Sequence, residues 1–261
     1  MVYTTIRTQI SGPVARVSLN RPEVRNAFNQ TVIAEMTDFF AELAVDGDLR
    51  AVVLDGEGKS FCAGADLEWM QRMSGYTFDE NRDDAVRMSS MFEAIDRAPI
   101  PVIAKVHGAV LGGGCGLVSC ADIVVASESC VFGLTEVKLG IIPAVISPFV
   151  VSKIGGSHAR ALFMTGERFS ASRAAAIGLV HHVVPESELE STVARLAGEL
   201  VTSGPVAARE AKRWVSMVVQ MTKVEASAHA AQKIAQLRAS PEGREGITAF
   251  LEKRKPSWIA S

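Results

Sequence analysis

The spacing of apolar positions changes along the chain and predicts which segments form strands. Residues 14–19 alternate between apolar and polar side chains, the pattern of a half-buried strand. Short apolar runs beside turn residues predict three more strands. These are residues 51–55, which end in the turn Asp55-Gly56-Glu57-Gly58, residues 102–106, which follow Pro99 and Pro101, and residues 122–126.

A helical spacing of apolar residues separates these strands. Asn29 is a plausible N-cap for an amphipathic helix that extends to about Val45. Residues 66–73 and 81–97 are predicted to be helical, with a looser link at 74–77. Strands that alternate with helices indicate an α/β core.

The last part of the chain is mostly helical. The predicted helices there are residues 187–202, 205–219, 223–239 and 241–253. We therefore divide the chain into a core, residues 1–186, and a C-terminal helical region, residues 187–261.

Composition and charge exclude several classes of protein. The 261 residues are 48% hydrophobic, enough for one large domain or a domain with a helical arm. The net charge is −2, so no global field favours nucleic acid or an anionic membrane. Residues 1–7 lack the apolar core of a signal peptide, and the longest apolar run, 139–151, is broken by Pro143 and Pro148. We expect a soluble, cytoplasmic protein.

The cysteines give no sign of a disulfide or a metal site. Cys62, Cys115, Cys120 and Cys130 form no CxxC pair and have no histidine at ligand spacing. Reduced, packed thiols and no bound metal are therefore expected.

Residues 105–116 (KVHGAVLGGGCG) lead from an apolar strand through three glycines into a predicted helix. Backbone approaches a ligand closely only where side chains are absent, which Gly112-Gly113-Gly114 provides. A helix beginning near Cys115 would add its N-terminal partial positive charge. Taken alone, a triple glycine is more often a flexible turn.

Residues 132–143 (FGLTEVKLGIIP) contain one acidic residue, Glu136. A lone glutamate is most often solvated. The apolar residues that follow it, up to Ile146, instead suggest a desolvated wall. Such a wall would raise the pKa of Glu136 toward the range of a general base.

Together with residues 61–67 (FCAGADL), these two segments resemble the crotonase superfamily, the enoyl-CoA hydratases and isomerases. The resemblance covers essentially the whole chain. It implies the crotonase fold, a spiral of repeated β-β-α units followed by a helical region used in trimer formation. It also implies an acyl-CoA substrate, no separate cofactor, and a homo-oligomer, either a trimer or a dimer of trimers.

The resemblance further implies roles for single residues. The backbone N–H groups of Ala65 and Gly113 donate to the thioester oxygen of an enolate-like state, and Glu136 handles the proton. Loss of one such donor costs about 3–4 kcal/mol. The residues expected to line the substrate beside them are Ala63, Asp66, Leu67, Gly112 and Gly116.

Two segments resemble the CoA-binding parts of the family. Residues 20–28 (NRPEVRNAF) match the segment along the pantetheine and adenine, with Arg25 and Ala27 as the matching residues. Residues 249–255 (AFLEKRK) match the basic segment that reaches the CoA phosphate in a neighbouring subunit, with Lys253 as the matching residue. For Lys255, a solvated charge at a helix end is an equally good interpretation.

The hydratases of this family have two glutamates flanking the substrate, twenty residues apart; here the second matches Glu136 and the first is Gly116. One carboxylate leaves two reactions open. Glu136 either moves a proton between Cα and Cγ, as in the Δ3,Δ2-enoyl-CoA isomerases, or alone activates water for reversible hydration. We favour hydration because residues 116–120, 136–151 and 240–258 are similar to the bacterial branch assigned to 3-methylglutaconyl-CoA hydration in leucine breakdown.

That substrate carries a distal carboxylate. A second ionised glutamate about 4 Å away would repel it by roughly 4 kcal/mol at an effective dielectric near 20. Gly116 removes that charge and is expected to open space. Arg72, Arg82 and Arg87 are candidate partners for the distal carboxylate, although each is more simply a solvated helix charge.

A third hypothesis is a protein that binds without catalysis, either an acyl-CoA scaffold or an RNA binder. The absence of a long basic stripe with interleaved aromatics argues against RNA. The retention of Glu136 beside both donor motifs argues against an inactive scaffold.

Overall fold

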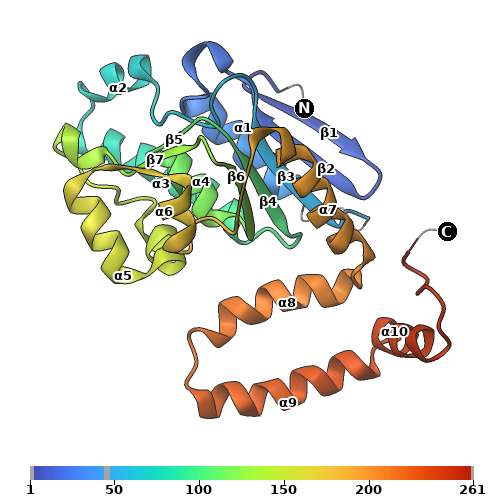
Figure 1. The fold of residues 1–261 in the computed structure, drawn as a ribbon. Coiled ribbons are helices and arrows are strands. Elements are labelled where there is room, and N and C mark those ends of the chain that lie inside the picture. The colour runs from blue at the N-terminus through green and yellow to red at the C-terminus, as the bar shows by residue number, and fades with distance from the viewer. Residues whose placement is uncertain (1–2, 44–47, 260–261) are drawn as a thin grey trace.

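The computed structural model describes residues 3–43 and 48–259. Two sheets are described, with six strands in the order β1-β2-β3-β4-β6-β9 and three in the order β5-β7-β8 (Figure 1). β1–β2 and β7–β8 are antiparallel, and the other pairs are parallel. The strands are β1 (Ile6–Ser11), β2 (Val14–Leu19), β3 (Ala51–Gly56), β4 (Val102–Val106), β5 (Ala109–Leu111), β6 (Ile123–Ser127), β7 (Val131–Gly133), β8 (Arg168–Ser170) and β9 (His182–Val184).

A β-β-α order repeats along the chain. β4 lies in the larger sheet, β5 in the smaller one, and α4 (Gly113–Cys120) follows; β6, β7 and α5 (Ser147–Thr165) repeat this order. A third unit consists of β3, the segment around Cys62 and α2 (Leu67–Met73). Cys62 forms a parallel bridge to Val110 of β5, so its segment occupies the position of the second strand of the unit, beside the smaller sheet. The predicted spiral of β-β-α units is confirmed.

The larger sheet is covered on both faces. In β3, Val52 and Leu54 belong to the main core, which includes side chains of α1 (Gln30–Leu43), α3 (Phe78–Asp96) and α4. Ala51 and Val53 belong to a second cluster with α7 (Leu189–Thr202) on the other side (Figure 1). Strands buried on both faces read as continuous apolar runs, which is why β3, β4 and β6 can be predicted from the sequence.

Local signals set the helix starts. The Val32 N–H donates to Asn29 Oδ1 (2.9 Å), so Asn29 caps α1 as predicted; the predicted end near Val45 lies outside the described residues. α3 begins earlier than predicted because Thr77 and Glu80 form a capping box, each accepting from the backbone N–H of the other. The unpredicted β1 is a mostly exposed edge strand, and β5, β7, β8 and β9 are too short for a periodic pattern.

The C-terminal region divides after its first helix. α7 packs on the sheet, whereas α8 (Pro205–Val218) and α9 (Lys223–Ala239) project from the core as a hairpin (Figure 1). Neither α8 nor α9 has a buried residue in the described chain, and their exposed large apolar side chains are Val206, Val215, Met217, Val224 and Ile234. Their use in trimer formation stays a prediction. The remaining helices are α6 (Ala171–Ala176), α10 (Pro241–Leu251) and the 3-10 turns η1 (Pro22–Val24), η2 (Glu136–Leu139) and η3 (Glu186–Glu188).

Candidate active site

The three segments predicted to form the site follow strand β5, strand β7 and an isolated parallel bridge that Cys62 makes to β5. Cys62 bridges to Val110 of β5, and β5 pairs with β7. Ala65 lies three residues after Cys62, Gly113 lies three residues after Val110, and Glu136 follows β7. The carboxyl ends of parallel strands meet at one edge of a sheet, where α/β proteins commonly bind ligands. The topology therefore gathers all three predicted catalytic residues at that edge.

The backbone around Ala65 is held by a parallel bridge to Phe28. The Phe28 N–H donates to Gly64 O (2.8 Å), and the Asp66 N–H donates to Phe28 O (2.8 Å). In such a bridge the N–H of the middle residue points away from the partner strand. Ala65 is exposed, and no hydrogen bond within residues 3–43 and 48–259 uses its N–H. This N–H is free to donate to a ligand.

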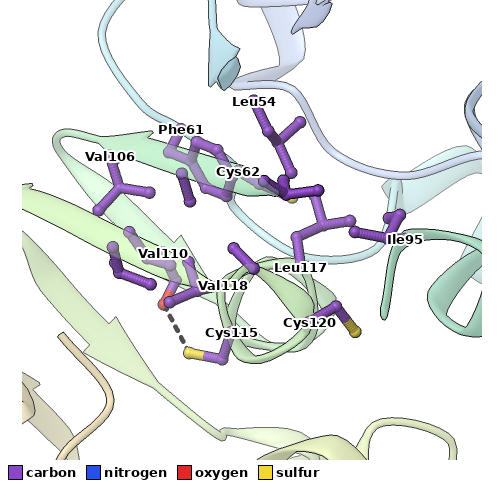
Figure 2. Close-up of a cluster of buried hydrophobic side chains, with 14 of the residues drawn as sticks. Leu54, Phe61, Cys62, Ile95, Val106, Val110, Cys115, Leu117, Val118 and Cys120 are labelled. Carbon is purple, nitrogen blue, oxygen red and sulfur yellow. Dashed lines mark hydrogen bonds between the residues drawn. The ribbon is translucent and has the colours of Figure 1, made fainter. Parts of the chain in front are cut away.

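The second predicted donor, the Gly113 N–H, lies at the start of α4. Gly112 precedes the helix with φ 51° and ψ −118°, a conformation that strongly favours glycine. Gly113 is the first helical residue, so its N–H has no partner within the helix. A Cβ on Gly113 would lie 2.4 Å from Phe28 Cε2, which requires a residue without a side chain. Figure 2 shows Cys115 and Leu117 among the buried side chains that hold this helix in the core.

Glu136 completes the group. A Cβ placed on Gly112 would lie 3.3 Å from Glu136 Oε1 and 3.9 Å from Gly64 Cα, so the carboxylate lies where the two glycine segments meet. In the part of the chain that the structure describes, the buried Oε2 of Glu136 accepts no hydrogen bond. Burial raises the pKa of Glu136. A desolvated carboxylate beside free N–H donors has the properties of a general acid/base.

An ion pair stabilises the turn that presents Ala65. Asp66 caps α2 by accepting from the Trp69 N–H (3.0 Å) and pairs with Arg21 Nη2 at 2.8 Å. Arg21 Nη1 also donates to Ala27 O (2.7 Å). Burial acts to raise the pKa of Asp66, but these hydrogen bonds and the Arg21 charge outweigh it, so the pKa is lowered. In the structure the Asp66 carboxylate binds Arg21 and the helix N-terminus, and its predicted place along the substrate stays a prediction.

Comparison with known proteins agrees with this geometry. Residues 9–260 match the model of the enoyl-CoA hydratase/isomerase family. The chain belongs to the enoyl-CoA hydratase/isomerase family. It is 35% identical to the short-chain-enoyl-CoA hydratase of Clostridium acetobutylicum over 98% of this chain and 97% of that one. It is 34% identical to the crotonyl-CoA hydratase of Syntrophomonas wolfei over the full length of both. The crystal structure of an enoyl-CoA hydratase from Shewanella pealeana superposes with a TM-score of 0.94 at 34% identity, covering 98% of this chain and 96% of that one. The predicted crotonase fold is thereby confirmed.

By resemblance, Gly116 stands at the position of the first of the two glutamates in the family's hydratases. The glycine does not open space there. It is buried in α4, and a Cβ on it would lie 2.4 Å from Ile146 Cγ2, 2.8 Å from Phe92 Cε1 and 2.9 Å from Phe92 Cζ. The expectation of an open space at this position is wrong, because these two side chains already fill it.

The predicted CoA-binding residues lie in two places. Arg25 is exposed with φ 55°, and its carbonyl accepts from the Ala63 N–H (3.0 Å), which places it beside the loop that carries Ala65. The Ala27 side chain is buried, and Leu67 is 81% exposed at the start of α2. Lys253 is exposed with φ 56°, just after α10, which contacts α8 and α9. Figure 1 shows α10 far from α4, so this single chain does not bring Lys253 to its own site.

The three candidate arginines differ in their pairing. Arg82 pairs with Asp79 (2.9 Å) and with Asp83 (2.9 Å), and Arg87 pairs with Asp84 (3.0 Å). Arg72, in the last turn of α2, is exposed and has no ion pair among the described residues. Of the three, Arg72 is therefore the most available to a substrate carboxylate.

The cysteines are buried thiols, and the described residues offer no cluster of metal ligands. Cys62, Cys115, Cys120 and Cys130 are free and buried, and burial raises the pKa of Cys62 to about 12. The described residues contain no cluster of three or more His, Cys, Asp or Glu side chains able to hold a metal. No described helix is long and apolar enough to cross a membrane.

The sequence analysis did not identify what two residues of this region, Arg21 and Ile146, contact. A buried aspartate requires a positive partner, but the sequence did not single out Arg21 for Asp66. Ile146 belongs to the apolar run after Glu136 that indicated a desolvated wall, but its contact with Gly116 depends on the way α4 and α5 meet.

Proposed function

We propose that this protein is a hydro-lyase that reversibly adds water to the double bond of an enoyl-CoA thioester. The observation that carries the proposal is the Glu136 carboxylate, which lies against Gly112 with one buried oxygen unpartnered within the described chain. Membership of the family and the names of the Clostridium acetobutylicum and Syntrophomonas wolfei relatives support it.

In the hydration direction, Glu136 removes a proton from water as the water oxygen bonds to the β-carbon. The electron pair of the double bond moves to the thioester oxygen as an enolate. The N–H groups of Ala65 and Gly113 donate to that oxygen, and loss of one such donor costs about 2.7–4 kcal/mol. Glu136 then returns the proton to the α-carbon as the carbonyl re-forms. The same carboxylate serves as base and acid, so no second carboxylate is required.

The raised pKa of Glu136 suits this double role. A carboxylate whose proton affinity is increased by burial accepts a proton from water more readily than a solvated one.

For the acyl group we propose 3-methylglutaconyl-CoA, giving 3-hydroxy-3-methylglutaryl-CoA. Its distal carboxylate would be repelled by a second ionised acid about 4 Å away by roughly 4 kcal/mol, and Gly116 supplies no such acid. The proposed cation for that carboxylate is Arg72, on the helix after Ala65, which forms no ion pair with another described residue. The relatives' names refer instead to crotonyl-CoA and short-chain enoyl-CoA, which makes the acyl group the part to test first.

A second candidate activity is Δ3,Δ2-enoyl-CoA isomerisation. It is favoured by the same single carboxylate, because moving a proton between Cα and Cγ needs one base and no bound water. The oxyanion donors would be the same N–H groups of Ala65 and Gly113.

The deciding experiment incubates the purified protein separately with 3-methylglutaconyl-CoA, crotonyl-CoA and a 3-enoyl-CoA and resolves the products by mass. Gain of one water on the first substrate, with much less on crotonyl-CoA, supports the proposal. Equal hydration of both substrates supports the hydratase activity but rules out 3-methylglutaconyl-CoA as the preferred substrate. A mass-neutral shift of the double bond identifies the isomerase, and tight binding without turnover of any substrate identifies a binding protein.

We also propose that the protein forms a homo-oligomer. A trimer or a dimer of trimers would cover the apolar side chains of α8 and α9 and could bring Lys253 of one subunit to the CoA phosphate held by another.

A further inference from the structure

A buried asparagine joins two loops that lie beside the predicted donor Ala65. Asn26 is 1% exposed, and its side-chain amide makes three hydrogen bonds. The amide nitrogen donates to Glu57 O (2.8 Å) and Ser60 O (2.8 Å), and the amide oxygen accepts from the backbone N–H of Arg21 (2.8 Å). The reverse orientation of the amide would put its oxygen against two carbonyl oxygens. Asn26 therefore fastens the turn that follows β3 to the loop that follows β2.

The backbone of this loop is strained where Asn26 lies. Arg25 and Asn26 have φ values of 55° and 56°, in the left-handed region that asparagine adopts more readily than most residues. With this backbone the Arg25 carbonyl accepts from the Ala63 N–H (3.0 Å). Such a conformation persists only where surrounding contacts enforce it, and the hydrogen bonds of the Asn26 amide are contacts of that kind.

The backbone around Ala65 is bonded to the backbone around Asn26. Ala63 donates to Arg25, and Phe28 forms the parallel bridge to Ala65 described for the candidate active site. The Ala65 N–H points away from that bridge, so its direction depends on where the loop lies. The buried Asn26 amide is the side chain that fixes this loop to the turn after β3.

We propose that Asn26 is a positioning residue for the enoyl-CoA reaction, and that it keeps the Ala65 N–H aimed at the thioester oxygen. Because it is buried, it acts only through the two loops that it joins. A misplacement of about 1 Å at a reacting group can lower the rate about a hundredfold, so a residue that touches no substrate can still control kcat. The inference rests on the proposed function and adds to it a residue outside the two donor segments.

Asn26→Asp tests the inference with a side chain of the same shape. The carboxylate still offers an acceptor to the Arg21 N–H, but it has no proton to donate to the carbonyls of Glu57 and Ser60. Asn26→Gly is the second variant, because glycine adopts a φ of 56° without strain and lacks the amide altogether. It carries the same expectations in the exchange experiment if Asn26→Asp does not fold.

Asn81→Asp is the matched control. The Asn81 side chain also donates to two backbone carbonyls, those of Tyr76 (3.1 Å) and Thr77 (3.0 Å), but it is exposed at the start of α3. The control therefore removes the same kind of contact from a different part of the chain.

Hydrogen exchange, read by mass spectrometry on a peptide that spans residues 57–66, tests the positioning without any substrate. At pH 7 we expect Asn26→Asp to speed exchange in this peptide at least about tenfold and Asn81→Asp to change it less than about threefold. Unchanged exchange in Asn26→Asp, or an equal change in both variants, overturns the proposal. The N–H groups of this peptide that are bonded to other segments include those of Phe61, Cys62 and Ala63.

The functional readout is kcat and KM for the enoyl-CoA that the parent hydrates best. At pH 8 we expect Asn26→Asp to lower kcat at least about tenfold and to change KM less than about threefold. The ratio of this kcat to that of the parent should rise as the pH falls, because a protonated Asp can again donate to a carbonyl and burial raises the pKa of a carboxyl group. Dividing by the parent removes the titration of Glu136, which both proteins share.

The outcomes separate the inference from the function on which it rests. If the parent hydrates no enoyl-CoA, the proposed function fails, while the exchange comparison still decides whether Asn26 holds the loop. If the parent is active and Asn26→Asp keeps its kcat despite faster exchange, Asn26 does not aim the donor and only the inference is wrong. A kcat ratio that stays constant with pH assigns the loss to general destabilisation and also overturns the inference.

Discussion

Replacing Asp66 with asparagine removes the charge that holds the Ala65 turn while keeping the size of the side chain. The Asn oxygen can still accept from the Trp69 N–H, so the cap of α2 is retained. The Arg21 side chain, 17% exposed, would lose its partner at 2.8 Å.

The expected loss follows from this geometry. Removing one partner of a buried ion pair costs about 3–5 kcal/mol because the other charge stays buried. Arg21 keeps some solvent contact and its hydrogen bond to Ala27 O, so we expect the lower end of that range, about 3 kcal/mol of unfolding free energy at pH 7. Asp66→Ala also loses the cap and should cost about 1 kcal/mol more.

The effect should depend on pH in a defined direction. The folded-state pKa of Asp66 is lowered below its unfolded value. Its ionisation therefore stabilises the fold at pH values above the unfolded pKa of about 3.9, and this contribution is lost as the pH falls through the folded pKa. The difference between the parent and Asp66→Asn should be largest at neutral pH and shrink below about pH 4.

Urea unfolding at pH 7 and pH 3 measures this difference, with Asp79→Asn as the matched control. Asp79 pairs with Arg82 at 2.9 Å, but both side chains are exposed, so this change should cost less than about 1 kcal/mol. Because Asp66 positions the Ala65 N–H, Asp66→Asn should also lower kcat at least tenfold with a smaller change in KM. A loss of stability no larger than that of Asp79→Asn would refute the argument.

Three further predictions follow from single contacts. Gly113→Val should reduce kcat at least a hundredfold, because its Cβ would lie 2.4 Å from Phe28 Cε2 and would push the proposed oxyanion donor out of place; a fully active variant would remove Gly113 from the proposed mechanism. Because burial raises the pKa of Glu136, kcat/KM should fall on the acid side with a midpoint above about 4.3, and a pH–rate profile with a lower midpoint would contradict this. Burial acts to raise the pKa of Glu35, but hydrogen bonds from Thr5 (2.7 and 2.8 Å) help to lower it overall. Glu35→Gln should therefore cost about 1–2 kcal/mol in urea unfolding at pH 7 and less as the pH falls through the folded pKa, whereas a loss that grows in acid would exclude this role.

The parts of the fold that could be predicted from sequence are those with local signals. Residues 51–55 and 102–106 are apolar runs because both faces of their strands are buried, and Asn29 caps α1 through its own nearest backbone. β7, β8 and β9 have three residues each, too few for any periodicity to identify. α8 could be placed in the sequence, but its projection from the core has no local signal.

In the candidate site too, features with a local sequence signal could be predicted and features that depend on distant residues could not. Gly112, Gly113 and Glu136 could be singled out because the resemblance rests on contiguous segments, and the structure places Glu136 beside Gly112. Their roles stay predictions. The expectation at Gly116 was wrong because the space beside a glycine is decided by residues distant in sequence, here Phe92 and Ile146. A missing side chain is therefore no sign of a vacant volume in a close-packed core.

Glu136→Gln tests the central claim most directly. Glutamine keeps the shape of the side chain and removes the proton acceptor, so CoA-thioester binding and the thermal midpoint should stay close to those of the parent. Hydration of the best enoyl-CoA substrate, followed by mass as gain of one water, should fall at least about a hundredfold. A variant that keeps most of the parent's hydration rate would contradict the assignment of Glu136 as the acid/base.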